Sequence, residues 1–287
     1  MEKLSTFTFS AKAYCLLTKP GIIAGNLITT AAGFFLAQQE KSVLLFLAAM
    51  CGLACIIASG CVLNNCIDRA ADAKMQRTKH RARLFQQVSV QNATAFALLL
   101  GILGTWCLFH FTNLIATTVA LFGFFTYVAL YTYSKYRSVH GTLVGSVAGA
   151  VPPVVGYTAA SGTLDAGAWI LFLMLVLWQM PHFYAIAMYR HEDYEAASIP
   201  VLPVQKGIRA AKVQMLGYIV GFVGACWLLA WCGYVGATFV VGSTLLSALW
   251  FNLGVQGFWC KNDTVWARKM FICSLVVILG VSGLIIL

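Results

Sequence analysis

The stretch that decides the fold is VLLFLAAMCGLACIIASGCVL at residues 43–63, followed directly by NNCIDRAAD at residues 64–72. The first part has no charged residue, and its apolar character is continuous rather than alternating, which indicates a membrane-crossing helix and not a barrel strand. Since lipid offers no hydrogen-bond partner to an exposed backbone, a helical bundle is then the only spanning structure available. The second part places an amide and two carboxylates at the end of the span.

Eight further stretches are long and apolar enough to cross a bilayer. With the first, the predicted spans are 21–38, 43–63, 92–110, 113–133, 140–160, 167–187, 212–232, 234–255 and 267–287. No low-complexity linker or soluble segment separates them. We therefore expect an all-α polytopic membrane protein, a nine-transmembrane-helix bundle that forms one domain over residues 1–287.

The composition supports a lipid-facing surface. Of the residues, 60% are hydrophobic and only 10% charged, whereas soluble domains carry about a quarter charged residues and disordered chains carry more. The net charge of +10 would suggest nucleic acid in a soluble protein, but here the basic residues lie between apolar runs. We expect the lipid bilayer as a partner and no nucleic acid. The ten cysteines include no Cys-x-x-Cys pair and are expected as small core residues.

The basic residues predict the orientation. Eighteen of the 19 Lys and Arg residues fall on one side of the predicted spans, and Lys41 alone falls on the other. Because cytoplasmic loops are enriched in Lys and Arg, the N-terminus is expected in the cytoplasm and the C-terminus outside. Residues 1–19 contain no recognisable presequence or cleavage site. We therefore expect a bacterial inner-membrane protein with a periplasmic C-terminus.

Asn64, Asp68 and Asp72 recur at every fourth position, so they share one face of a helix that leaves the membrane. Amide and carboxylate oxygens suit Mg²⁺, which completes its coordination with waters and phosphate oxygens. Cations that are able to hold the same phosphates follow directly: Lys74, Arg77, Lys79, Arg81 and Arg83. The pattern favours a lipid diphosphate bound at the cytoplasmic mouth. The alternative is a set of solvated charges that cap a helix and fix the topology.

Several motifs carry a resemblance to a known family. The 64–72 motif and YTYSK at 131–135 resemble two motifs of the intramembrane (UbiA-type) prenyltransferase superfamily. Further segments are similar to its protoheme IX farnesyltransferase family. They are TKPG at 18–21, MQRT at 75–78 with Arg81, GAVPP at 149–153, WQMPHF at 178–183, DY at 193–194 and IPVLP at 199–203.

The resemblance implies transfer of a farnesyl group from farnesyl diphosphate to a vinyl group of heme B, giving heme O. The implied cofactor is Mg²⁺, held by Asn64, Asp68 and Asp72, and heme B is a substrate. Lys135 and Tyr131 are implied in catalysis with these three residues. The substrates are implied to contact Lys74, Arg77, Arg81, His140, Gln179, His182, Phe183 and Asp193. Assembly factors of heme-copper oxidases are the implied protein partners.

Two positions depart from the family pattern. The superfamily's second acidic motif is usually Asp-x-x-x-Asp, whereas Ala197 follows Asp193 here. The segment therefore lacks the full acidic pair that would hold a second Mg²⁺. Ala82 stands where many members have proline, which concerns loop shape more than chemistry.

Residues inside the spans have two interpretations each. His182 either contacts heme, as an iron ligand or a propionate partner, or satisfies an interhelical hydrogen bond. His140, near the cytoplasmic loop, is another candidate for a propionate. Pro181 and the Pro152–Pro153 pair are expected to kink or open their helices. The aromatic candidates for a prenyl tunnel, each of which has core packing as its alternative, are Tyr131, Tyr133, Phe183 and Tyr184.

Other functions stay open at this point. A quinone precursor such as 4-hydroxybenzoate is an alternative acceptor. A heme or lipid transporter would fit the prolines, although transport sites normally lie near the bilayer midplane. A heme chaperone without catalytic activity is a third possibility.

Overall fold

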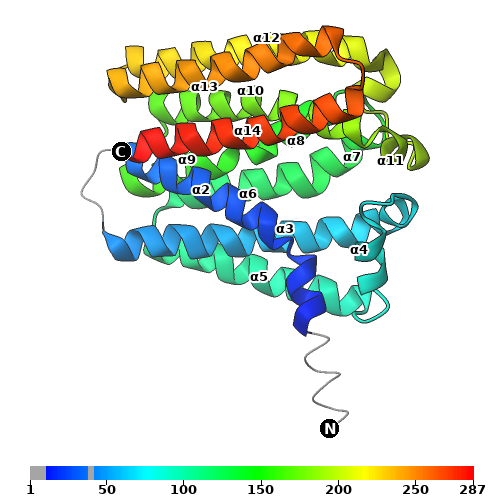
Figure 1. The fold of residues 1–287 in the computed structure, drawn as a ribbon. Coiled ribbons are helices and arrows are strands. Elements are labelled where there is room, and N and C mark those ends of the chain that lie inside the picture. Colours follow the sequence, from blue (N-terminus) through cyan, green and yellow to red (C-terminus); the bar gives the residue numbers. More distant parts are fainter. Residues whose placement is uncertain (1–10, 38–41) are drawn as a thin grey trace.

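The computed structural model describes residues 11–37 and 42–287, and all regular structure in these ranges is helical (Figure 1). A short helix over residues 11–17 comes first. It is followed by α2 (Pro20–Leu36), α3 (Val43–Lys74), α4 (Lys79–Leu84), α5 (Val90–Phe111), α6 (Leu114–Phe125), the π-helix η1 (Thr126–Tyr131), α7 (Thr132–Lys135), α8 (Gly141–Gly149), α9 (Val151–Ser161), α10 (Ala166–Tyr189), α11 (His191–Ala196), α12 (Leu202–Trp231), α13 (Ala237–Gln256), the 3-10 helix η2 (Gly257–Trp259) and α14 (Asp263–Ile286).

The predicted all-α membrane bundle is confirmed. Eight helical rods in the described ranges are long and apolar enough to cross a membrane, with α6–η1–α7, α8–α9 and α13–η2 each counting as one rod. The remaining predicted span, 21–38, corresponds to α2, which is apolar but only 17 residues long. The count of nine therefore holds approximately, with one helix slightly short of the about 20 residues that a full crossing needs.

Three boundaries differ from the predicted spans for local reasons. α3 runs past residue 63 to Lys74 without a break, so the acidic motif is part of the same helix. The predicted span 140–160 is divided at Ala150, just ahead of the proline pair. α12 begins at Leu202 rather than at residue 212, and Gly207 interrupts it with a φ of 81°, a left-handed conformation that glycine adopts without strain.

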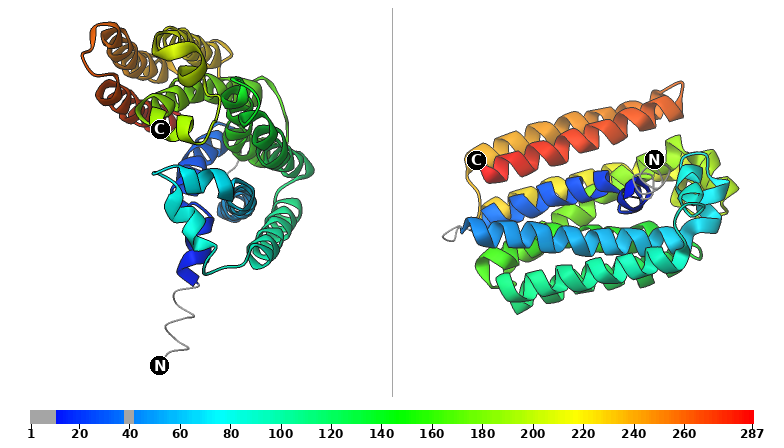
Figure 2. Two further views of the ribbon diagram at one scale, coloured as in Figure 1. Left: turned by 90° about the vertical axis from the view of Figure 1, so that its right-hand side faces the viewer. Right: turned by 90° about the horizontal axis from the view of Figure 1, so that it is seen from below.

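The long helices run side by side, with the short elements α4, α7 and α11 gathered at one end and the C-terminus at the other (Figures 1 and 2). This arrangement places the acidic motif and the C-terminus at opposite ends, as the predicted topology requires. Lys3 and Lys41, which entered that prediction, lie outside the described residues. Large apolar side chains on the outer faces, such as Ile102, Leu114 and Leu249, are each about two-thirds exposed and suit contact with lipid.

Candidate active site

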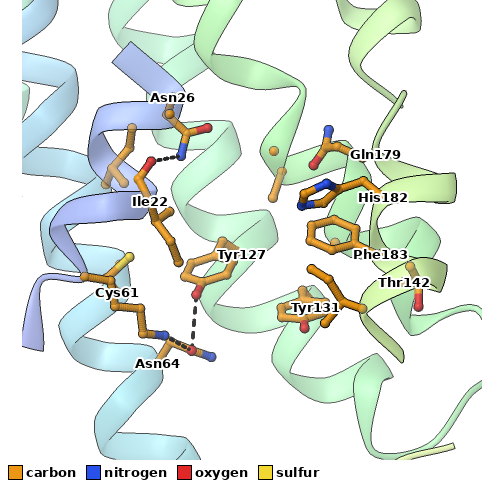
Figure 3. Close-up of a pocket in the computed structure, with 18 of the residues that line it drawn as sticks. Ile22, Asn26, Cys61, Asn64, Tyr127, Tyr131, Thr142, Gln179, His182 and Phe183 are labelled. Carbon is orange, nitrogen blue, oxygen red and sulfur yellow. Dashed lines mark hydrogen bonds between the residues drawn. The ribbon is translucent and has the colours of Figure 1, made fainter. Parts of the chain in front are cut away.

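A cavity of about 820 Å³ lies between α2, α3, α6, α8 and α10 and extends to α14 (Figure 3). The lining side chains near the loop end of the bundle are charged: Lys19, Asp68, Asp72, Arg77, Arg81 and Lys135. Those further into the bundle are mostly apolar or aromatic, among them Leu53, Ile56, Phe124, Leu175 and Ile278. The cavity therefore joins a charged mouth to an apolar interior.

The uninterrupted α3 carries Asn64, Asp68 and Asp72 along one wall of the cavity. Their exposed fractions are only 4%, 9% and 8%. This burial argues against the alternative in which they are solvated charges that cap a helix. Buried carboxylates need partners or ligands to offset their lost hydration.

Asp68 has two such partners from the segment after α6. Its Oδ2 forms an ion pair with Lys135 Nζ, and its Oδ1 accepts a hydrogen bond from Tyr136 OH at 2.8 Å. Burial and the nearby Asp68 carboxylate together raise the pKa of Tyr136, so its hydroxyl stays a donor. Thus the structure brings together Asp68 and Lys135, two residues from separate motifs of the sequence.

Asn64 is held by two donors that the sequence did not single out. Lys19 Nζ donates to Asn64 Oδ1 at 2.9 Å. Tyr127 OH donates to the same oxygen at 3.1 Å, as a dashed line in Figure 3 shows. Asn64 Nδ2 is buried and has no hydrogen-bond partner among the described residues. Burial lowers the pKa of Lys19 to about 8, because a cation loses hydration there.

Arg77 and Arg81 line the mouth without an anionic partner. Neither forms a salt bridge within 4 Å in the described parts of the chain, and Arg77 Nε is buried without a hydrogen bond. Burial, and then the proximity of Arg77, lower the pKa of Arg81. The Asp72 carboxylate likewise accepts no hydrogen bond from a described residue. Partly buried guanidinium groups with free donors are typical of an anion-binding site.

A π-helical segment shapes the next part of the cavity. The η1 segment places Tyr127 and Tyr131 in a parallel stack, with ring centroids 5.8 Å apart and planes 9° apart. Glycines lie opposite both rings: a Cβ at Gly145 would come within 2.9 Å of Tyr131, and one at Gly60 within 3.2 Å of Tyr127. Single-turn π segments are frequent at functional sites. Both rings line the cavity.

Gln179, His182 and Phe183 face this space from α10 (Figure 3). Gln179 Nε2 donates to the carbonyl oxygens of Ser146 and Leu175, each at 3.0 Å. A Cβ at Gly149 would lie 2.0 Å from Gln179 Oε1, so the glycine makes room for this amide. The His182 ring stacks on Trp178 with centroids 4.8 Å apart. α10 continues as a helix through Pro181.

Other sequence-predicted residues do not line the cavity. Lys74 and His140 are exposed. Asp193 Oδ1 accepts a hydrogen bond from the Gln76 backbone at 2.7 Å, so it connects α11 to the segment between α3 and α4. Tyr133 is 66% exposed with Arg137 over its ring, and Tyr184 is buried against Gln214, so neither contributes to a prenyl tunnel through this cavity.

Four residues that contact predicted site residues through side-chain polar atoms were not themselves predicted: Lys19, Tyr127, Tyr136 and Ser274. Lys19 lies in the TKPG segment, which carried part of the resemblance but gave no role. Tyr127 and Tyr136 are four residues before and five residues after Tyr131, in a region where any aromatic residue is as easily core packing. Ser274, in the last helix, contacts His182 and lies outside every motif. Only the three-dimensional arrangement identifies it.

A helical membrane protein with a charged mouth and an aromatic interior in one cavity has the features of an intramembrane prenyltransferase. The UbiA prenyltransferase family matches residues 26–276, and the chain belongs to this family.

Comparisons with individual proteins agree with this membership. The chain is 48% identical over 273 residues to protoheme IX farnesyltransferase 2 of Pseudomonas aeruginosa, which covers 94% of this chain and 92% of the relative. The fold of this chain is similar to that of digeranylgeranylglyceryl phosphate synthase, with a TM-score of 0.78 at 18% identity. The match covers 96% of this chain and 99% of that one. A UbiA homolog from Archaeoglobus fulgidus bound to GPP and Mg²⁺ gives a TM-score of 0.64 at 13% identity, covering 96% and 99%.

Proposed function

We propose that the protein transfers the farnesyl group of farnesyl diphosphate to a vinyl group of heme B, which gives heme O and diphosphate. The observation that carries this proposal is the single cavity that joins partnerless arginines at its mouth to an aromatic interior containing His182. The 48% identity to a protoheme IX farnesyltransferase over 94% of the chain supports heme as the acceptor.

The mouth fits a diphosphate. Arg77 and Arg81 have donors that no described residue engages and that suit phosphate oxygens. Lys135 lines the same cavity and forms an ion pair with Asp68. Cations that are already in place where negative charge develops stabilise the transition state without reorganisation. These side chains would therefore favour departure of the diphosphate, because they stabilise it more as it leaves than while it is bonded to carbon.

Mg²⁺ fits the same residues. Asp68 and Asp72 lie one helical turn apart, and the Asp72 carboxylate accepts no hydrogen bond from a described residue; only its backbone carbonyl does, from Thr78. Both lone pairs of Asn64 Oδ1 are engaged by Lys19 and Tyr127, so the two aspartates are the residues that would hold the ion. No group of three or more His, Cys, Asp or Glu side chains suited to a metal occurs in the described chain, so diphosphate oxygens would complete the coordination. When bound, Mg²⁺ would neutralise charge on the diphosphate.

The reaction needs no protein nucleophile. The bond between C1 of the farnesyl group and the diphosphate oxygen breaks, and its electron pair leaves with the diphosphate. The terminal vinyl carbon of heme bonds to C1, and water adds to the cation left on the inner vinyl carbon and loses a proton. The stacked faces of Tyr127 and Tyr131 would stabilise the allylic cation, while the surrounding apolar side chains exclude water until the new carbon–carbon bond has formed.

We also propose that the protein lies in a bacterial inner membrane with its cavity mouth toward the cytoplasm. The basic residues of the described loops, next to that mouth, support this orientation. Transfer of the product to assembly factors of heme-copper oxidases belongs to the same proposal.

The test is product analysis by mass spectrometry after purified protein is incubated with heme B, farnesyl diphosphate and Mg²⁺. We expect a farnesylated, hydrated heme whose formation stops with a chelator and resumes with added Mg²⁺. Parallel reactions with 4-hydroxybenzoate test the acceptor. Unmodified heme beside a prenylated phenol would overturn the choice of heme, and no prenylated product from folded protein would overturn the enzyme assignment in favour of transport or a chaperone role.

A further inference from the structure

His182 is held in a fixed orientation at the cavity wall. Its ring stacks on Trp178 and lies 4.9 Å from Phe271, centroid to centroid, so aromatic side chains border it from α10 and α14. Its Nδ1 lies 2.8 Å from Ser274 Oγ on α14. The contact anchors one ring nitrogen away from the substrate space, while the side chain as a whole lines the cavity.

The hydrogen bonds of Ser274 determine which nitrogen carries the proton. Ser274 Oγ donates its only hydrogen to the carbonyl oxygen of Phe271 at 2.6 Å. With the hydroxyl in this orientation, Ser274 Oγ is an acceptor toward His182, and Nδ1 is the donor. The Ser274 side chain is fully buried, and its own carbonyl accepts a hydrogen bond from Trp178 Nε1 at 2.8 Å, so the backbone that carries the hydroxyl is tied to the residue on which His182 stacks.

In a neutral imidazole only one nitrogen carries a hydrogen. With that hydrogen on Nδ1, Nε2 has a free lone pair and no hydrogen to donate. No described residue forms a hydrogen bond with Nε2, and no ionised side chain of the described chain contacts the ring. A nitrogen in this state can coordinate a metal but cannot donate to a carboxylate. This distinguishes the two heme-binding roles that the sequence left open, and it argues against a propionate partner.

We infer that Ser274 is a positioning residue that fixes His182 in the Nδ1–H tautomer, so that Nε2 coordinates the iron of the porphyrin acceptor. The inference rests on the proposed function, because it takes heme as the acceptor. Hydrogen-bond partners that orient a metal-binding histidine commonly contribute 10- to 100-fold to metal affinity. Axial coordination would hold the porphyrin at one depth and thus help to place a vinyl group near the farnesyl C1.

The experiment compares heme B with metal-free protoporphyrin IX, titrated into purified protein and followed by absorption and resonance Raman spectroscopy. In wild type we expect an iron–imidazole stretching band for reduced heme, which His182→Ala removes. Ser274→Ala is expected to weaken heme binding about 10- to 100-fold and reduce that band, with metal-free porphyrin binding changed less than about twofold, since only the iron uses Nε2. Ser274→Thr, which keeps the hydroxyl, should restore heme binding.

Ser282→Ala is the matched control, because Ser282 is also a buried serine of α14 and lies outside the cavity lining. It should bind both porphyrins as wild type does. Equal losses of both porphyrins in Ser274→Ala would assign Ser274 a merely structural role and overturn the inference, as would an unchanged iron–imidazole band. Nitrogen-15 NMR of histidine-labelled wild type tests the tautomer without any variant: a protonated Nε2 on His182 would overturn the inference.

The outcomes separate this inference from the proposed function. Farnesylated heme formed by a wild-type protein that lacks the iron–imidazole band would overturn the inference and leave the function standing. Heme bound with that band but never farnesylated would support the inference and overturn the function.

Discussion

Two aspartate–lysine ion pairs show how surroundings decide what a residue does. Asp68 pairs with Lys135 in the cavity wall, near Arg77 and Arg81, which form no salt bridge with any residue that the structure describes. Asp263 pairs with Lys212, which also donates to the Gly257 carbonyl oxygen at 2.6 Å, and neither residue lines the cavity. The first pair can exchange partners with a charged ligand, whereas the second fastens α12 to the turn before α14.

We predict that Asp68→Asn lowers kcat about 100-fold or more, because it removes a carboxylate where charge is stabilised in the transition state. The control is Asp263→Asn, which breaks the other lysine ion pair and should change kcat less than about twofold, since its surroundings are away from the chemistry. Steady-state rates of heme farnesylation measure both, and circular dichroism checks that both variants fold. Near-wild-type activity of Asp68→Asn would contradict the role of this carboxylate.

Lys19 is the other residue whose role depends on its neighbours. Its backbone has a φ of 56°, which is uncommon for a non-glycine residue, directly before Pro20. The surrounding contacts keep this conformation, and they direct the ammonium group to Asn64 at the cavity mouth.

Lys19→Met is predicted to raise the KM for farnesyl diphosphate about 10- to 100-fold, because it removes a cation from the mouth where the diphosphate is proposed to bind. A hydrogen bond to a charged group contributes free energy of this size. The charge-matched control is Lys12→Met, because Lys12 is exposed on the preceding short helix. Initial rates at varied farnesyl diphosphate concentration measure the effect. If both variants raise KM equally, the effect arises from the membrane-surface charge and not from the site.

At the scale of helices, α2 and α9 approach each other through two glycines. A Cβ at Gly33 would lie 1.9 Å from the Pro153 carbonyl oxygen, and one at Gly156 would lie 1.9 Å from that of Thr30. Small residues that bring helix backbones together are typical of packing in membranes, where apolar side chains gain little by leaving lipid. This contact holds α2, and therefore Lys19, against the rest of the cavity wall.

We predict that Gly156→Ala lowers the free energy of unfolding by about 1–3 kcal/mol, because the added methyl group meets backbone that cannot move aside cheaply. Gly224→Ala on α12 has no atom within 4 Å of its new Cβ and is the control. It should be neutral or stabilising by up to about 1 kcal/mol, from helix propensity. Thermal unfolding in detergent compares the two, and an equal Tm for both variants would contradict the close packing of α2 on α9.

At the scale of the whole molecule, the fold separates two ends. The connections that contain α4 and α11 gather at the cavity mouth, and the C-terminal end of α14 lies at the opposite end (Figure 1). Most loop cations belong to the first end, which is the expected cytoplasmic side.

Topology fusions test this orientation in cells. Alkaline phosphatase, which is active only after export, is expected to be active when fused after Leu287 and inactive when fused after Gln87. The reason is that the basic loops retain the second site in the cytoplasm. Green fluorescent protein at the same two positions should give the opposite pattern. Active phosphatase after Gln87 would reverse the orientation and place the cavity mouth outside.

Much of the fold follows from local properties of the chain. The positions of the long helices and the shared face of Asn64, Asp68 and Asp72 depend on hydropathy and on the helical repeat, which are readable along one segment. The break before the proline pair at 152–153 is local in the same sense.

The composition of the site is only partly local. Sequence motifs predicted Asp68 and Lys135, but not that they form a pair, and they included Asp193, which instead connects α11 to the segment between α3 and α4. Helical spacing states which face a residue occupies and not which helix that face meets.

The sequence alone determined that this chain is a membrane-spanning helical bundle with an acidic motif and a cationic segment at one end. Hydrophobic runs and fixed spacing suffice for that, because each helix satisfies its own backbone in lipid. Only the tertiary structure decided that Lys19 reaches Asn64 and that Ser274, 92 positions from His182, contacts its ring nitrogen. Those contacts depend on which of several similar apolar helices pack against each other. That packing depends on local shape, such as the close approach of Gly33 to Pro153, which hydropathy does not encode.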